Sequence, residues 1–153
     1  MQRILLPVAH FQHPHAGECL PACAFMVLSY HGVVVSYTRL TKLLGTIPGF
    51  GTPSFRLIDT GRSLGVNFEY GQGSLATLYS HLQKNRPSIA FVQTGQLPYW
   101  TEDVPHAVVV IGMSGSEVYL NDPAVVQAPL AVPLGDFDLA WLERDELYAV
   151  ITD

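Results

Sequence analysis

The chain has 153 residues, of which 48% are hydrophobic and 14% charged, so it is of single-domain length and can bury a substantial core. Its formal net charge is -5 and its eight Lys and Arg residues form no cluster, which argues against a nucleic acid partner or an anionic membrane surface. No apolar stretch approaches the ~20 residues that cross a bilayer, and residues 1–11 lack a signal-peptide core. We therefore expect one domain, residues 1–153, in the cytoplasm, without membrane insertion.

The first strong helix pattern starts at Cys19. The run that follows is apolar on nearly every face, has Pro21 in its first turn and is stopped by Gly32, which predicts a central, buried helix. Cys23 follows Cys19 by four residues on the same helix. This spacing is poor for a disulfide, so we expect two free thiols.

Three more helices are expected in the first half of the chain. Ser36, Ser54 and Ser74 each precede leucines at helical spacing, and Gly45 and Gly65 follow the first two of these patterns. Ser36 and Ser74 are in the position of a helix cap, and Ser54 marks the expected start of the helix between them.

The second half of the chain carries strand patterns instead. Short, β-branched segments bounded by Gly, Pro or Asn predict strands, and these are residues 88–92, 107–111, 118–120 and 148–151. Residues 114–116, Ser-Gly-Ser, predict a hairpin turn, and residues 136–142 a short helix. Helices followed by strands predict an α+β fold rather than an alternating one.

Cys19 has three interpretations. At a helix N-terminus, backbone N–H groups and the helix dipole favour a thiolate, so it can be a nucleophile. It can also be a small buried hydrophobe, as we expect Cys23 to be. A zinc site from His10, His13, His15 and the two cysteines has suitable ligand types, but the spacing matches no standard pair of ligand pairs.

His106 and Asp122 complete a candidate catalytic set. His106 follows Pro105 at the start of a predicted strand, and Asp122 or Asn121 returns to its level if that strand and the next form a hairpin. A surface histidine and an Asx turn before a proline are the alternatives. A cysteine followed far downstream by a histidine and then Asp or Asn is the pattern of a thiol protease.

A thiol protease also needs an oxyanion hole. The backbone N–H of Cys19 supplies one donor, and Gln12, seven residues earlier, is the natural second donor, with His13 as the alternative. Either side chain can equally be a solvated loop residue. Tyr99 and Trp100 are expected to flank the cleft and bind substrate, or else to cap the core of the sheet.

Three blocks of the sequence resemble the bacteriocin-processing, or double-glycine leader, peptidase family of papain-like cysteine peptidases. They are residues 18–26 (ECLPACAFM), 105–112 (PHAVVVIG) and 121–124 (NDPA). The resemblance implies a papain-like fold with Cys19 as nucleophile, His106 as base, Asp122 as orienting residue and no cofactor.

The chain departs from the family pattern at two positions. The family usually has Gly after the cysteine, where this chain has Leu20, which we expect to narrow the approach to the thiol and to contact the substrate. The family usually has its oxyanion glutamine six residues before the cysteine, where this chain has His13. Many members are fused to an export transporter, but this chain has no Walker A motif, so we expect a free-standing relative that acts on a peptide or protein and associates with a separate transporter or substrate peptide.

Two other functions use the same cleft. The three residues can pass an acyl group to an amine or attack a glutamine side chain, which would make the chain an acyltransferase or a deamidase. The domain can also be a non-catalytic module that only binds peptides.

Overall fold

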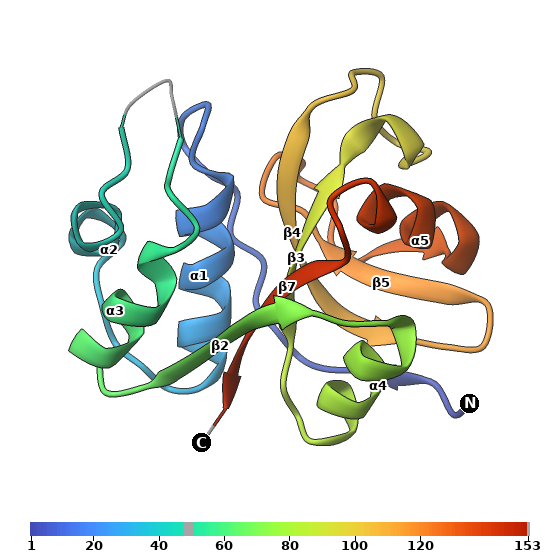
Figure 1. Cartoon of the computed structure of the whole chain (residues 1–153), viewed down its shortest axis with the longest axis horizontal. Helices are drawn as coiled ribbons and strands as arrows, with labels where there is room; N and C mark the ends of the chain where they lie inside the picture. Colours follow the sequence, from blue (N-terminus) through green and yellow to red (C-terminus); the bar gives the residue numbers. More distant parts are fainter. Residues whose placement is uncertain (48–50, 153) are drawn as a thin grey trace.

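The computed structural model describes residues 1–47 and 51–152. Figure 1 shows a group of helices on the left, which we call the helical lobe, and a twisted sheet with further helices on the right. The helical lobe contains α1 (Cys19–Tyr30), α2 (Tyr37–Leu43) and α3 (Arg56–Ser63). The other helices are α4 (Leu75–Gln83), the short 3-10 helix η1 (Thr94–Gln96) and α5 (Leu134–Leu142).

The described residues form a sheet of seven strands in which every pairing is antiparallel. The strands are β1 (Ile4–Leu5), β2 (Asn67–Gln72), β3 (Ser88–Gln93), β4 (Pro105–Met113), β5 (Glu117–Asn121), β6 (Leu130–Pro133) and β7 (Leu147–Thr152). Their order is β2-β7-β3-β4-β5-β6, and β1 pairs with β4 beyond the end of β3. The predicted α+β class is therefore confirmed.

Helix α1 is the central helix that the sequence predicts. Eight of its residues are buried, and it packs against β4 and β3. Its N-cap, Glu18, is itself buried and accepts a hydrogen bond of 2.9 Å from the Tyr37 hydroxyl at the start of α2. This bond fixes the start of α1, where the thiol of Cys19 lies, within the helical lobe.

Strand β4 is buried along nearly its whole length, from His106 to Met113. It does not alternate between buried and exposed residues because α1 packs on it from the helical lobe while α4 packs on it as well, on the side of the sheet away from α1 in Figure 1. The result is a rigid central strand with the imidazole of His106 near one end.

Serine caps explain two of the other helices. Ser36 accepts a hydrogen bond from the Arg39 N–H, and Ser74 forms a reciprocal capping box with Thr77, as the sequence predicts. The third helix begins at Arg56, slightly later than the predicted start at Ser54.

The sequence predictions locate four of the strands, α5 and the hairpin turn, in which the Ser114 N–H donates to the Glu117 carbonyl. Strands β1, β2 and β6 were not predicted. Edge strand β2 buries only Phe68, and half of its six residues are of types disfavoured in strands, while β1 and β6 are only two and four residues long. In the described residues no helix has both the length and the hydropathy needed to span a bilayer.

Gly112 allows β1 to approach β4. A Cβ atom at Gly112 would overlap the Ile4 carbonyl oxygen and lie 3.0 Å from the Tyr119 ring, whereas a Cβ atom at Gly115 in the nearby turn would meet nothing within 4 Å. We expect Gly112→Ala to lower the free energy of unfolding by about 1–3 kcal/mol because backbone atoms must shift. Gly115→Ala is the matched control and should change it by less than ~0.5 kcal/mol. Urea denaturation followed by circular dichroism measures both, and equal effects would contradict the packing argument.

Candidate active site

Three polar side chains from separate elements meet between the helical lobe and the sheet. Cys19 is the first residue of α1, His106 lies at the start of β4, and Asp122 directly follows β5. Strands β4 and β5 pair as a hairpin, which returns the chain to the level of His106. The distance from His106 Nε2 to Asp122 Oδ1 is 2.7 Å, so the predicted contact between imidazole and carboxylate is present.

The Asp122 carboxylate is fully buried and saturated with donors. Oδ1 accepts from His106 and from the Ala124 N–H at 2.9 Å, and Oδ2 accepts from the Tyr99 hydroxyl at 2.6 Å and from Trp100 Nε1 at 3.0 Å. Burial raises the pKa of Asp122, but these bonds, led by the one from His106, outweigh it and lower the pKa to about 2. The group is therefore an anion across the physiological pH range.

The His106 ring is held on two sides. Asp122 engages Nε2, and the Trp100 ring packs against the imidazole with 5.0 Å between centroids. Burial lowers the pKa of His106, but its bonds to Asp122 and Cys19 outweigh burial and raise the pKa to about 9. Because Nε2 is occupied, Nδ1 is the nitrogen left to face the Cys19 thiol.

The two thiols differ in the direction of their pKa shifts. Burial raises the pKa of Cys19, but the hydrogen bond and charge of His106, with backbone N–H groups of Ala107 and Leu20, outweigh burial and bring the pKa below its ordinary value. Cys23 is fully buried, and desolvation raises its pKa well above the ordinary value. The structure thus distinguishes an activated thiol from a core thiol one helical turn away.

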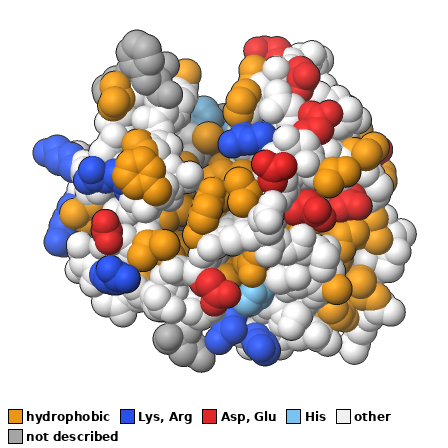
Figure 2. Space-filling model, viewed as in Figure 1, with side chains coloured by type: hydrophobic (Ala, Val, Ile, Leu, Met, Phe, Trp, Pro, Cys, Tyr) orange, Lys and Arg blue, Asp and Glu red, His pale blue; other side chains and the backbone are white. Residues whose placement is uncertain are grey.

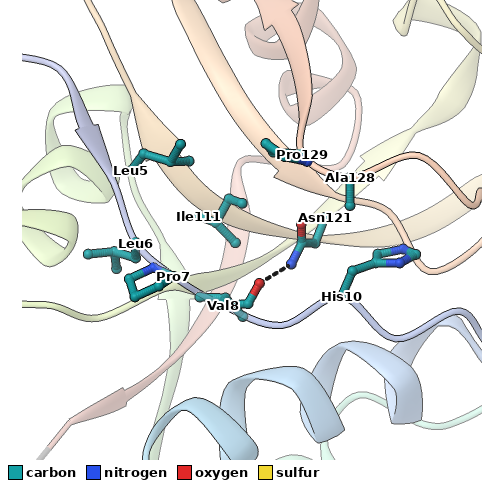
Figure 3. A pocket seen from close by; sticks show the side chains of 9 residues that line it. All are labelled: Leu5, Leu6, Pro7, Val8, His10, Ile111, Asn121, Ala128 and Pro129. Carbon is teal, nitrogen blue, oxygen red and sulfur yellow. Dashed lines mark hydrogen bonds between the residues drawn. The ribbon is translucent and has the colours of Figure 1, made fainter.

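The N-terminal segment, residues 8–13, is hydrogen-bonded to the residues around Asp122. Three bonds join them: Asn121 Nδ2 to the Val8 carbonyl at 2.9 Å, His10 Nε2 to the Asp122 carbonyl at 2.8 Å and the His13 N–H to the Pro123 carbonyl at 2.9 Å. Figure 3 shows the bond between Asn121 and Val8, beside a cavity of about 320 Å³ that contains neither Cys19 nor His106. Asn121, the sequence alternative to Asp122, therefore anchors this segment rather than the imidazole.

Two cavities open from the thiol and the imidazole. Both are lined by Gly17, Cys19, Pro105 and His106. One, of about 260 Å³, continues to Leu20 and Arg144, and the other, of about 320 Å³, continues to His13 and Trp100. Because they share no other lining residue, they extend from the thiol in different directions. Figure 2 shows the surface hollowed into a notch between the helical lobe and the sheet.

Comparison with known proteins identifies the family of this chain. The family model of the peptidase C39 family matches residues 9–143. The chain belongs to the peptidase C39 family. No match was found among curated proteins. The predicted resemblance is confirmed, since the double-glycine leader peptidases are C39 enzymes.

Three solved structures share the C39 fold with this chain at 19% sequence identity. One, described as a C39-like peptidase from Bacillus anthracis, has a TM-score of 0.85, with 100% of this chain and 98% of that chain covered. A double glycine motif protease from an AMS/PCAT transporter, solved with its leader peptide, has a TM-score of 0.75, with 99% and 97% covered. The peptidase domain of Streptococcus ComA has a TM-score of 0.76, with 95% and 98% covered. The expected papain-like fold is confirmed.

The three residues of this C39 member that were expected to bind substrate do not all line a cavity at Cys19. Leu20 lines the cavity beside Cys19, and its contact with substrate stays a prediction. Tyr99 and Trp100 were expected to contact substrate, and the structure places their polar atoms on Asp122, although Trp100 also lines a cavity. The polar group of a buried Tyr or Trp usually needs a hydrogen-bond partner. This requirement is the sequence feature that could have predicted the contact of Tyr99 and Trp100 with Asp122.

The metal alternative finds no support in the described residues of this C39 member, among which no group of three or more His, Cys, Asp or Glu could hold a metal ion. His10 instead bonds the Asp122 carbonyl. Sequence analysis missed both this role of His10 and the position of Arg144 in the cavity beside Cys19, because neither residue belongs to a periodic pattern or motif.

The site of this C39 member predicts selective alkylation of Cys19. A thiolate is lost as pH falls through its pKa, so the lowered pKa of Cys19 extends its reactivity to lower pH than that of an ordinary thiol of pKa ~8.5. We expect iodoacetamide to label Cys19 at least roughly tenfold faster than Cys23 at pH 6. In His106→Ala the Cys19 rate at pH 6 should fall by a similar factor and rise only toward alkaline pH, while Cys23 stays slow in both proteins because it is fully buried. Residue-resolved mass spectrometry from pH 4 to 9 measures both rates, and an unchanged profile in His106→Ala would contradict the assignment of the lowered Cys19 pKa to His106.

Proposed function

We propose that this C39 family member is a cysteine peptidase that cleaves peptide bonds with Cys19, His106 and Asp122. The observation that carries the proposal is the chain of contacts from a buried, ionised Asp122 through His106 to a thiol of lowered pKa at the start of α1. A thiolate beside an imidazolium is the resting state that nucleophilic attack on a carbonyl requires at neutral pH.

The reaction has two stages. The Cys19 sulfur attacks the carbonyl carbon, and the negative charge that develops on the oxygen is stabilised by the Cys19 backbone N–H. His106 then donates its Nδ1 proton to the leaving amine, the C–N bond breaks, and a thioester remains. In the second stage neutral His106 takes a proton from water, the hydroxide oxygen attacks the thioester, and the product leaves as a carboxylic acid while the thiolate and imidazolium are restored.

Asp122 acts through His106 rather than on the substrate. Its negative charge favours the imidazolium, and its bond to Nε2 turns Nδ1 toward Cys19. The donors Tyr99 and Trp100 keep the carboxylate itself in one orientation. These two aromatic residues therefore support catalysis from behind the imidazole.

The proposed substrate is a leader or precursor peptide. This proposal is supported by family membership and by two of the similar structures, one described as the peptidase domain of a bifunctional transporter and the other solved with a leader peptide. A separate transporter is the corresponding proposed partner.

Peptidase activity is tested with a library of peptides from a digested proteome. The wild-type chain should generate new peptide termini, and Cys19→Ala should lower their yield by a factor of at least about 10³. Addition of an amine separates the alternatives, because amide products would indicate an acyltransferase and conversion of glutamine to glutamate a deamidase. Retained peptides without new products would indicate a binding module and would contradict the proposal.

His13 is the proposed second oxyanion donor, in place of Gln12. The His13 ring lines a cavity with Cys19 and His106, and burial and the charge of His106 lower its pKa, so it is a neutral N–H donor near pH 7. Gln12 is exposed, and its side chain makes no hydrogen bond with the described residues.

Three variants test this assignment. His13→Ala should lower kcat by about 10²–10³, the cost of losing one oxyanion donor. His13→Gln restores an amide donor at the position where the family usually has glutamine and should keep kcat within about tenfold of wild type. Gln12→Ala should leave kcat unchanged, and a large loss in this variant with a small one in His13→Ala would reverse the assignment.

A further inference from the structure

The cavity that is lined by Cys19 and Leu20 also has a charged residue, Arg144, in its lining. Among the described residues that line it, Arg144, which follows α5, is the only charged one besides His106, while Thr52 and Ser54 belong to the helical lobe. Most of its other lining is apolar or glycine, with no carboxylate. A guanidinium beside apolar groups interacts more strongly with an opposite charge than it would in open solvent.

The backbone around Arg144 is held in a strained conformation. The next two residues, Asp145 and Glu146, have φ values of 60° and 55°, which side-chain-bearing residues rarely adopt. Hydrogen bonds fix this turn from three directions: Glu146 N–H to the Trp141 carbonyl at 3.0 Å, Gln72 Nε2 to the Asp145 carbonyl at 3.1 Å and Gly73 N–H to the Glu146 carbonyl at 3.1 Å. The turn therefore presents Arg144 from a fixed position at the cavity.

Arg144 has no carboxylate in ion-pair contact in the part of the chain that the structure describes. Its side chain is half-buried, and within residues 1–47 and 51–152 it forms no ion pair and no hydrogen bond. Its acidic neighbours Glu143, Asp145 and Glu146 do not line the cavity, and Glu143 instead accepts a bond from Gln96. A half-buried guanidinium without a carboxylate partner is suited to accept one from a ligand.

We propose that Arg144 is a specificity-determining residue that binds an Asp or Glu side chain of the substrate near the scissile bond. The inference rests on the proposed peptidase function and adds a substrate class to it. An extended peptide advances about 3.3 Å per residue, so a cavity shared by the thiol and Arg144 selects an acidic residue within roughly three positions of the bond that is cut. The cavity on the other side of the thiol contains Glu102 instead, which gives the cleft opposite charges along its length.

Cleavage is one arm of the test. Termini generated from the peptide library by wild type should be enriched in Asp or Glu at one position within three residues of the cut. For a matched substrate pair with Glu or Gln there, wild type should prefer Glu by roughly ten- to a hundredfold in kcat/KM. Arg144→Gln should bring this ratio to about one, and Arg144→Glu should favour Lys. Arg39→Gln removes the same charge from an exposed position on α2 and should leave the ratio unchanged.

Binding is the other arm and does not need turnover. The Cys19→Ala chain should retain the Glu peptide more tightly than the Gln peptide, and addition of Arg144→Gln should abolish the difference. In one outcome, peptides are cut, no acidic position is enriched and Arg144→Gln cuts both substrates as wild type does. This outcome overturns the role of Arg144 and leaves the proposed peptidase function intact. If nothing is cut but Cys19→Ala still distinguishes the two peptides through Arg144, the peptidase proposal fails and the acidic recognition stands.

Discussion

The carboxylate of Asp122 is the group on which the arrangement of the site depends. A wholly buried anion is costly unless its oxygens are satisfied, and here four donors supply that compensation. Removal of any one donor would leave part of the Asp122 charge uncompensated. The segments that provide the four donors are therefore held in fixed positions relative to one another. The position of His106, and through it the state of the Cys19 thiol, follows from this network.

Backbone atoms next to Asp122 carry part of the same network. Its carbonyl accepts from His10, and the following carbonyl, of Pro123, accepts from the His13 N–H. The segment between these histidines is therefore aligned with the site by main-chain contacts, which is how His13 reaches the cavity of Cys19 while its neighbour Gln12 faces solvent. A shift of one residue in this loop changes which side chain can serve the reaction.

The sequence predicts best where a local pattern has one physical meaning. The apolar run after Cys19 can only be a buried helix, and Ser36 and Ser74 cap their helices through bonds to nearby residues. Edge strand β2 could not be predicted, because its pairing with β7 depends on residues some 80 positions away and its own composition disfavours a strand. Cys19, His106 and Asp122 were found by their order along the chain and because each was expected at the end of a helix or strand. Arg144 was not found, because its position depends on how the turn after α5 meets the opposite lobe.

The thiol of Cys19 and the imidazole of His106 belong to different parts of the fold, since Cys19 begins a helix of the helical lobe and His106 lies at the start of a strand of the sheet. Their contact therefore exists only while α1 remains docked on β4. A slight opening between helix and strand would return the thiol to an ordinary acidity while both parts kept their secondary structure. On warming, such a partial opening precedes global unfolding whenever its free energy is the smaller of the two. The pKa of the Cys19 thiol thus reports whether the helical lobe is docked on the sheet.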